Sequence, residues 1–270
     1  MDRSCILDPL TQPLPFTPFK DFTGRSINEI NLYSTEMSSA LCSIDRVSAS
    51  ANMNNRLSEA IVEAYKSTNG APISFELMLK CYQSRMKDAN NDDSISSVLK
   101  QLVNAHIFES EDKVSLIDDS YIIKMDGYPK DGPIAKAIVY FLMSKLNNIY
   151  ELLDKQAVND EVVQIRHFSI IDEAHYMLDF DNRPLRNLIA VGRNKGLSII
   201  LATQNMSSFK SKGFDFYANA QYPLIMKQQT IDDKVIKDLF GVSGQELQEI
   251  RTAIAGLQNC LLYTSPSPRD

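Results

Sequence analysis

Two adjacent carboxylates, Asp172 and Glu173, follow the short apolar run at residues 168–171. Such a run is typical of a buried strand in a parallel sheet, and open α/β sheets place their ligands at the carboxyl ends of these strands. The pattern is that of a Walker B strand. Asp172 would hold the Mg²⁺ of a nucleotide through water, and Glu173 would polarise the water that attacks the γ-phosphate. The pair therefore indicates nucleotide hydrolysis, although it could also end a strand in an ordinary acidic turn.

A second apolar run, at residues 197–202, ends in Thr203 and Gln204. Parallel strands joined by a helical crossover are neighbours, which would bring Gln204 beside Asp172 and Glu173. Gln204 could then contact the γ-phosphate or the attacking water and report the loss of the phosphate. We expect Thr203 to line the nucleotide site with it.

Two cations, Arg193 and Lys195, precede this second run. They could complete the site of a neighbouring subunit, because a cation supplied in trans stabilises the charge that develops on the transferred phosphoryl group. Arg193 could equally satisfy the dipole at the end of a helix. The residue pattern leaves both interpretations open.

The motifs IIDEAH at 170–175, GRNKG at 192–196 and SIILATQ at 198–204 resemble, in order and spacing, the FtsK/HerA superfamily of hexameric DNA-pumping ATPases. The chain looks most similar to the HerA-like and conjugative-transfer branches, and among them to the DptH-type ATPases of phosphorothioation-dependent DNA restriction. This resemblance covers most of the chain. It implies ATP and Mg²⁺ as cofactors, a homo-oligomeric ring expected to be a hexamer, DNA in the ring channel, and restriction-system or transfer-system proteins as partners.

One motif of this superfamily is absent from the 270 residues, namely Gly-x-x-x-x-Gly-Lys-Ser/Thr. The backbone N–H groups and the lysine of this loop cradle the nucleotide phosphates. Proteins of the superfamily place the loop upstream of the segment that corresponds to Cys5. We therefore expect the chain to begin inside a longer gene product and to be inactive as an ATPase by itself. At the other end, residues 260–270 read as a translated sequencing adaptor and are interpreted as a cloning or assembly scar.

The fold that would position these residues is α/β: a RecA-like parallel-sheet P-loop NTPase core without its first strand and phosphate loop, carrying a helical insert. The expected division is the start of the core at 1–25, the insert at 26–112, the remaining core at 113–259 and the non-native tail at 260–270.

Local patterns support this division. Helical periodicity covers 26–68, and helices are predicted at 75–86, 94–106 and 232–240. A strand at 120–125 leads into a long helix at 134–153, and 154–164 reads as a polar loop. Helices followed by an apolar strand also resemble a winged helix, but the βα unit that follows favours an insert.

Composition agrees with one sizeable core plus a subdomain, since 44% of residues are hydrophobic and 23% are charged. No segment reads as a membrane span or a signal peptide, and the cysteines show no C-x-x-C spacing, so we expect a cytoplasmic protein. The net charge of −6 argues against a DNA-coating basic face but not against a ring that touches DNA only in its pore. The segment 205–213 could contact DNA or a neighbouring subunit, or it could be a solvated loop.

The function expected from these features is that of an ATP-driven, helicase-like DNA translocase subunit, with DNA restriction or defence as the expected setting. One alternative is a non-catalytic RecA-like ring or scaffold subunit. Another is a conjugation or secretion ATPase that moves protein or a protein–DNA conjugate. No histidines have metal-ligand spacing; His175 could contact the nucleotide site or be structural.

Overall fold

The structure is a computed structural model, and it describes residues 5–44, 49–87, 91–159, 162–177, 180–204, 210–211, 214–215, 223–226 and 230–257. Most of the segment 205–213 and all of the tail at 260–270 lie outside the described residues. The chain divides into two compact units. The first comprises Met1–Ile171 with Asp179–Leu201, and the second comprises Asp172–Leu178 with Ala202–Asp270.

The first unit contains the long helices and the parallel strands. Its helices are α1 (Ile27–Ile44), α2 (Ala51–Ser67), α3 (Phe75–Gln83), α4 (Ser94–Ala105), α5 (Pro133–Leu152), α6 (Arg183–Val191) and the 3-10 turn η2 (Gly192–Lys195). Its strands are β1 (Cys5–Leu7), β2 (Tyr121–Ile123), β3 (Val158–Asn159), β4 (Val162–Val163), β5 (His167–Ile171) and β6 (Leu197–Leu201).

The helices α2 to α4 begin where side chains cap their first turns. The Ser50 and Ser74 hydroxyls accept hydrogen bonds from the third backbone N–H of α2 and α3, respectively. Asp93 and Ser96 form a reciprocal capping box at the start of α4. These caps confirm the helices predicted at 75–86 and 94–106, although α3 ends three residues earlier. The division at residues 26 and 112 remains a prediction.

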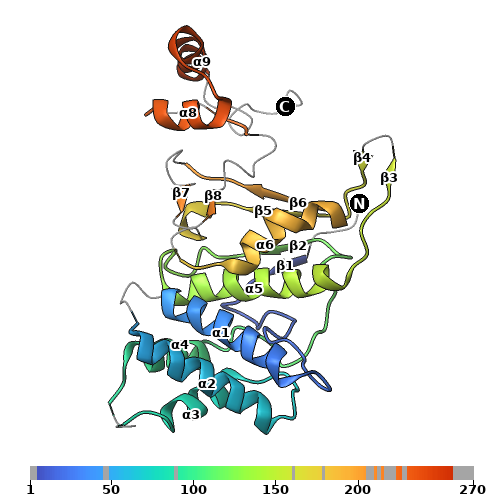
Figure 1. Cartoon of the computed structure of the whole chain (residues 1–270), viewed down its shortest axis with the longest axis vertical. Coiled ribbons are helices and arrows are strands. Elements are labelled where there is room, and N and C mark those ends of the chain that lie inside the picture. The colour runs from blue at the N-terminus through green and yellow to red at the C-terminus, as the bar shows by residue number, and fades with distance from the viewer. Residues whose placement is uncertain are drawn as a thin grey trace, which may run out of the picture. The chain divides into compact units, whose positions relative to one another are not determined.

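Helix α5 forms the middle layer of the first unit, between the parallel strands and the helices α1 to α4 (Figure 1). Its Phe141 ring is fully buried and meets Phe19 and Phe75 edge-to-face, with centroid distances of 5.6 and 5.3 Å. Phe19 comes from the proline-rich segment after β1, and Phe75 begins α3. An apolar cluster therefore joins the amino-terminal segment, the helical layer and α5.

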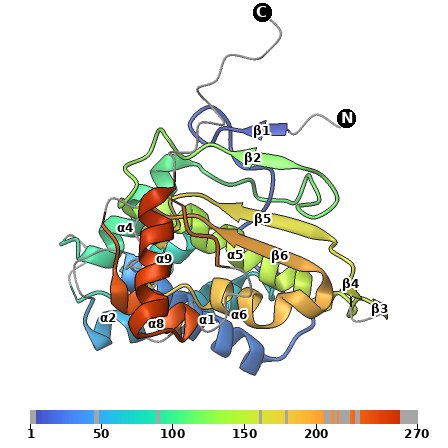
Figure 2. The same ribbon diagram turned by 90° about the horizontal axis from the view of Figure 1, so that it is seen from above.

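The strands form two parallel pairs, β1 with β2 and β5 with β6, which run side by side in Figure 2. The register pairs Ile6 with Ile122 and Ile171 with Leu201. The expected strand at 120–125 and helix at 134–153 are thus present as β2 and α5. The polar loop expected at 154–164 is wrong in part, because Val158 and Val163 pair in the antiparallel hairpin of β3 and β4.

The second unit contains η1 (Ala174–Met177), β7 (Lys210–Ser211), β8 (Phe214–Asp215), α8 (Asp233–Phe240) and α9 (Gly244–Gly256). Strands β7 and β8 pair in antiparallel fashion. Helices α8 and α9 pack together through Ile236, Leu247 and Ile254. The helix predicted at 232–240 is confirmed, with Asp232 as its cap. No helix among the described residues has the length and apolar character needed to span a membrane.

Candidate active site

The candidate site begins where β5 and β6 end together. Because the parallel register pairs Ile171 with Leu201, the residues that follow leave the two strands at the same edge. Beyond that edge, the Ala174 amide donates to the Ala202 carbonyl at 2.7 Å, and Ala174 is fully buried. The two chain segments that carry the predicted site residues are therefore joined through their backbones.

Glu173 and Gln204 meet at this edge, as the sequence predicts. The Gln204 Nε2 atom donates a hydrogen bond to Glu173 Oε1 at 2.6 Å. The Glu173 side chain is 22% exposed, so its carboxylate is reachable by solvent while most of its surface is covered. A carboxylate held at the end of a parallel strand can orient a water, and a side-chain amide beside it can donate a hydrogen bond to a phosphate oxygen.

Asp172 is exposed, and its Oδ1 accepts a hydrogen bond from the Glu173 amide at 2.8 Å. The described residues contain no group of three or more histidine, cysteine or acidic side chains that could hold a metal. Mg²⁺ is commonly bound through one or two carboxylates, waters and the phosphates of its substrate. Asp172 fits that mode, in which the ion would enter with the nucleotide.

Glu173 has a backbone conformation that the sequence did not indicate. Its φ angle is +52°, in the left-handed region that residues other than glycine rarely adopt. This conformation costs about 1–2 kcal/mol for an L-residue with a side chain. Non-glycine residues in this region are enriched at functional sites. The strained backbone therefore belongs to Glu173, the residue whose carboxylate is predicted to orient the attacking water.

Thr203 and His175 lie next to this pair. The Thr203 Oγ1 atom is 3.2 Å from His175 Nδ1, and the same ring nitrogen is 3.4 Å from Glu173 Oε2. The His175 ring also contacts Tyr176, with a centroid distance of 4.1 Å. The structure thus gives His175 a contact with the predicted site residues and not only a place in the η1 turn.

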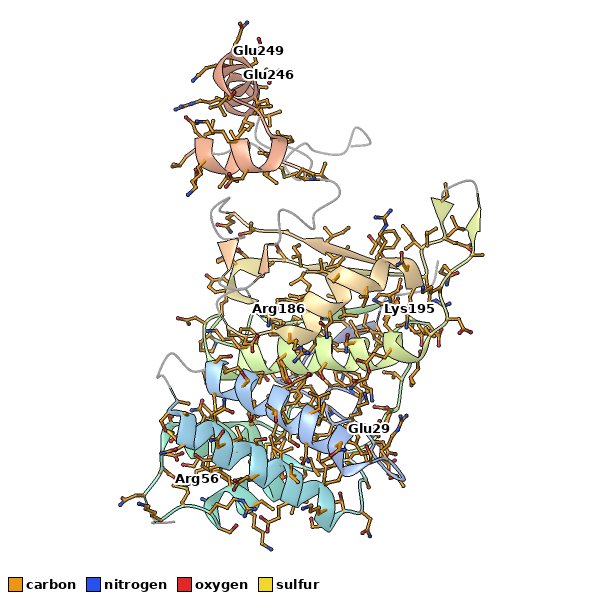
Figure 3. All side chains as sticks on the ribbon, in the orientation of Figure 1. Glu29, Arg56, Arg186, Lys195, Glu246 and Glu249 are labelled. Carbon is orange, nitrogen blue, oxygen red and sulfur yellow. The ribbon has the colours of Figure 1, made fainter. Side chains whose placement is uncertain are left out.

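Arg193 and Lys195 lie in η2, before the start of β6, whereas Thr203 and Gln204 follow its end. Arg193 is exposed. Lys195 Nζ donates to the carbonyls of Tyr150 and Glu151 at 2.6 and 3.0 Å, at the carboxyl end of α5 (Figure 3). A cation there satisfies carbonyls that have no partner within the helix. Lys195 therefore has a structural role at α5, and the role of Arg193 in trans stays a prediction.

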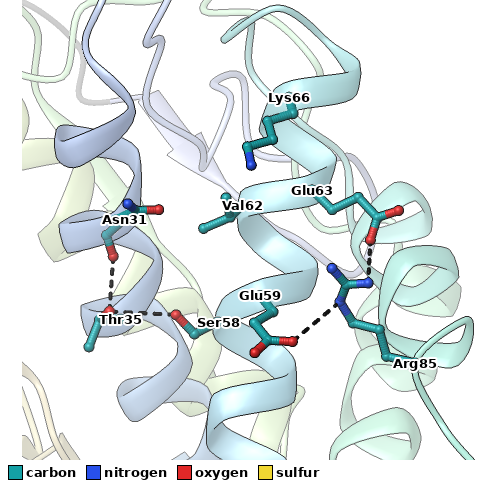
Figure 4. Close-up of a pocket in the computed structure, with 8 residues that line it drawn as sticks. All are labelled: Asn31, Thr35, Ser58, Glu59, Val62, Glu63, Lys66 and Arg85. Atoms are coloured by element: carbon teal, nitrogen blue, oxygen red, sulfur yellow. Dashed lines mark hydrogen bonds and ion pairs between the residues drawn. The ribbon is translucent and has the colours of Figure 1, made fainter.

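A shallow groove of about 390 Å³ lies elsewhere in the first unit, between α1 and α2 (Figure 4). Its cation Arg85 lies 2.6 Å from Glu63 and 3.9 Å from Glu59. Lys66 also lines the groove, and the two carboxylates balance the charges of the two cations. The groove therefore has no net positive charge with which to bind the phosphates of a nucleotide.

No family model and no curated protein matches this sequence. Among solved structures, VirB4 of Thermoanaerobacter pseudethanolicus is similar, with a TM-score of 0.59 at 17% identity over 91% of this chain and 70% of that one. The plasmid coupling protein TrwB in complex with a non-hydrolysable ATP analogue reaches 0.47 at 13% identity, over 94% of this chain and 58% of that one. A TM-score below 0.5 does not establish a common fold, so the assignment rests on VirB4. The likeness to VirB4 shows that the chain has a RecA-like α/β fold.

Proposed function

We propose that this chain is part of the ATPase core of a ring-forming motor that moves DNA. The observation that carries the proposal is the hydrogen bond between Gln204 and Glu173 at the shared end of two parallel strands. A scaffold protein has no need to hold a carboxylate and an amide together in a strained backbone at this position. In this proposal residues 26–112 are an insert in the core.

The chemistry would be in-line attack of water on the γ-phosphate of ATP. Bound Mg²⁺ would neutralise charge on the phosphate oxygens, and Asp172 is the residue that would hold it through water. Glu173 would accept a hydrogen bond from the attacking water and fix its direction. Gln204 would donate to the γ-phosphate or to that water. Thr203 would line the same site and orient His175.

The 270 residues contain no Gly-x-x-x-x-Gly-Lys-Ser/Thr, so the proposed chemistry requires a phosphate-binding loop supplied by other sequence. The test therefore uses the gene product that carries this chain together with such a loop. In that protein Glu173→Gln should bind ATP normally and lose turnover by about 10²–10⁴-fold, because the amide cannot act as a base. Glu246→Gln, at an exposed position on α9, is the matched control and should leave turnover unchanged. Near-normal turnover by Glu173→Gln would refute the assignment.

Arg193 would complete the site of the next subunit in the ring. Arg193→Ala should abolish turnover, and mixing it with Glu173→Gln subunits should restore part of the activity. Rescue is expected because, in a mixed ring, some interfaces combine Glu173 from an Arg193→Ala subunit with Arg193 from a Glu173→Gln subunit. An absence of rescue, with both variants forming rings, would assign Arg193 a local role.

A non-catalytic scaffold is the second candidate, because the phosphate loop is absent from the sequence at hand. If the gene product that contains this chain has no such loop and binds no ATP, the scaffold becomes the better assignment. A conjugation or secretion motor would keep the same chemistry and change the cargo. Neighbouring restriction and phosphorothioation genes would favour DNA defence, whereas pilus and channel genes would favour transfer.

A further inference from the structure

The imidazole of His175 lies between two side chains of the candidate site. Its Nδ1 atom is 3.4 Å from Glu173 Oε2 and 3.2 Å from Thr203 Oγ1. The ring cannot drift far from these atoms, because it packs on Tyr176 and because the backbone just before it is tied to Ala202. One nitrogen thus faces a carboxylate that follows β5 and a hydroxyl that follows β6.

The chemistry of these partners decides which ring nitrogen carries the proton. A carboxylate only accepts hydrogen bonds, whereas a threonine hydroxyl both donates and accepts. If Nδ1 carried a lone pair, that lone pair would face the negatively charged Oε2 of Glu173. If Nδ1 carries the proton, it can donate to Glu173 Oε2 and to Thr203 Oγ1. The tautomer of a histidine follows the hydrogen bonds of its nitrogens.

The two oxygens of Glu173 then have separate partners. Gln204 donates to Oε1, and His175 faces Oε2. The backbone of Glu173 is in the strained left-handed region. Such a conformation persists only when contacts with neighbouring groups hold it. We propose that His175 is a positioning residue that carries its proton on Nδ1 and, together with Gln204, fixes the direction of the Glu173 carboxylate. The contact between His175 and Glu173 is independent of the proposed function. Only the effect of this contact on turnover rests on the proposed function.

The tautomer can be measured on the 270-residue chain by ¹⁵N NMR of the imidazole rings, at a pH where the rings are neutral. The sequence has three histidines, so His→Gln variants assign each signal. His175 should show the proton on Nδ1. His106, which is exposed and forms the left-handed cap of α4, is the internal control and should show the Nε2–H form that free histidine favours.

Two variants distinguish the effects of Glu173 and Thr203 on the tautomer of His175. Glu173→Gly removes the carboxylate without adding strain at a left-handed position, and it should shift His175 towards Nε2–H. Thr203→Val removes only the hydroxyl and should leave the proton on Nδ1. An Nε2–H ring in the unsubstituted chain would overturn the proposal. So would a tautomer that responds to Thr203→Val and not to Glu173→Gly.

The effect on turnover is measured in the gene product that contains a phosphate loop. His175→Ala should lower kcat roughly 10- to 100-fold with little change in KM, because misplacing a catalytic group by about 1 Å has an effect of this size. His175→Asn should recover part of kcat, since its Nδ2–H lies where Nδ1–H was, and His175→Gln should not. If no ATP is hydrolysed while the Nδ1–H form is present, the proposed function fails and the contact stands. If ATP is hydrolysed and His175→Ala keeps kcat within about twofold, the positioning role fails.

Discussion

Gly196 links the starts of β5 and β6, and its replacement by alanine tests how these strands are held in register. Its φ angle is +82°. Its carbonyl accepts hydrogen bonds from the amides of Arg166 and His167 at 2.7 and 3.1 Å. The register of β5 against β6 in turn places Glu173 and Gln204 at one edge. Gly196→Ala should therefore strain the first unit at the point where the two strands begin.

The cost follows from the space around this glycine. A Cβ at Gly196 would lie 2.8 Å from the Gln164 carbonyl oxygen and 3.0 Å from the Arg166 amide, which are backbone atoms that cannot rotate away. The left-handed backbone costs alanine about 1–2 kcal/mol, and overpacking adds about 1–3 kcal/mol. Alanine recovers about 0.4–1 kcal/mol by restricting the unfolded chain. The net loss of unfolding free energy should be about 2–4 kcal/mol.

Gly24 supplies a matched control in the same unit. Its φ angle is +73°, and a Cβ there would meet no atom within 4 Å. Gly24→Ala should therefore lower the free energy of unfolding by only about 1 kcal/mol. This is the strain of the left-handed backbone minus the gain from restricting the unfolded chain. Urea unfolding of the 270-residue chain, with equal m-values, gives both free energies. Equal losses for the two variants would refute the reasoning, because the larger loss expected for Gly196→Ala comes from the close backbone atoms around Gly196.

Further predictions concern single residues in both units. At the left-handed position of Glu173, the Glu173→Gly variant should be more stable than Glu173→Ala by about 1 kcal/mol in urea unfolding, and the reverse order would contradict the φ angle of +52°. Lys195→Met should lower the free energy of unfolding by about 1 kcal/mol, because the carbonyls at the end of α5 lose their cation. Lys195→Arg should lower it less. An unchanged free energy of unfolding in Lys195→Met would refute the capping role. Burial lowers the pKa of His167, so the folded state binds fewer protons than the unfolded state between that pKa and about 6.5. Its contribution to stability is present above about pH 6.5 and is lost as pH falls towards the folded pKa. Melting temperatures measured across this range should depend less on pH in His167→Gln than in the original chain, and an unchanged pH dependence would contradict this.

The strands that carry the site were predictable because each is a short apolar run with polar residues at its carboxyl end. Residues 168–171 and 197–202 correspond to β5 and β6, and their parallel pairing places Glu173 by Gln204. The helices α3 and α4 were predictable from Ser74 and Asp93, since a capping side chain acts on the backbone a few residues away. These signals are local, and local signals are readable in a sequence.

Other features depend on partners distant in the chain. Lys195 binds carbonyls about 45 residues before it, and no sequence pattern reveals that α5 ends beside η2. The hairpin of β3 and β4 was missed because its valines are separated by polar residues in a segment that reads as a loop. The left-handed backbone of Glu173 has no sequence signal, because glycine and asparagine are the residues that usually mark it.

Glu173 and Gln204 are proposed to act on the attacking water and the γ-phosphate of ATP. The most direct measurement is a structure of the loop-containing gene product with Mg²⁺ and an analogue of the hydrolysis transition state. We expect Glu173 at about 2.6–3.2 Å from the attacking water and Gln204 at a similar distance from the terminal phosphate or that water. A bound nucleotide with both side chains out of hydrogen-bond reach of the phosphate and the water would contradict this proposal.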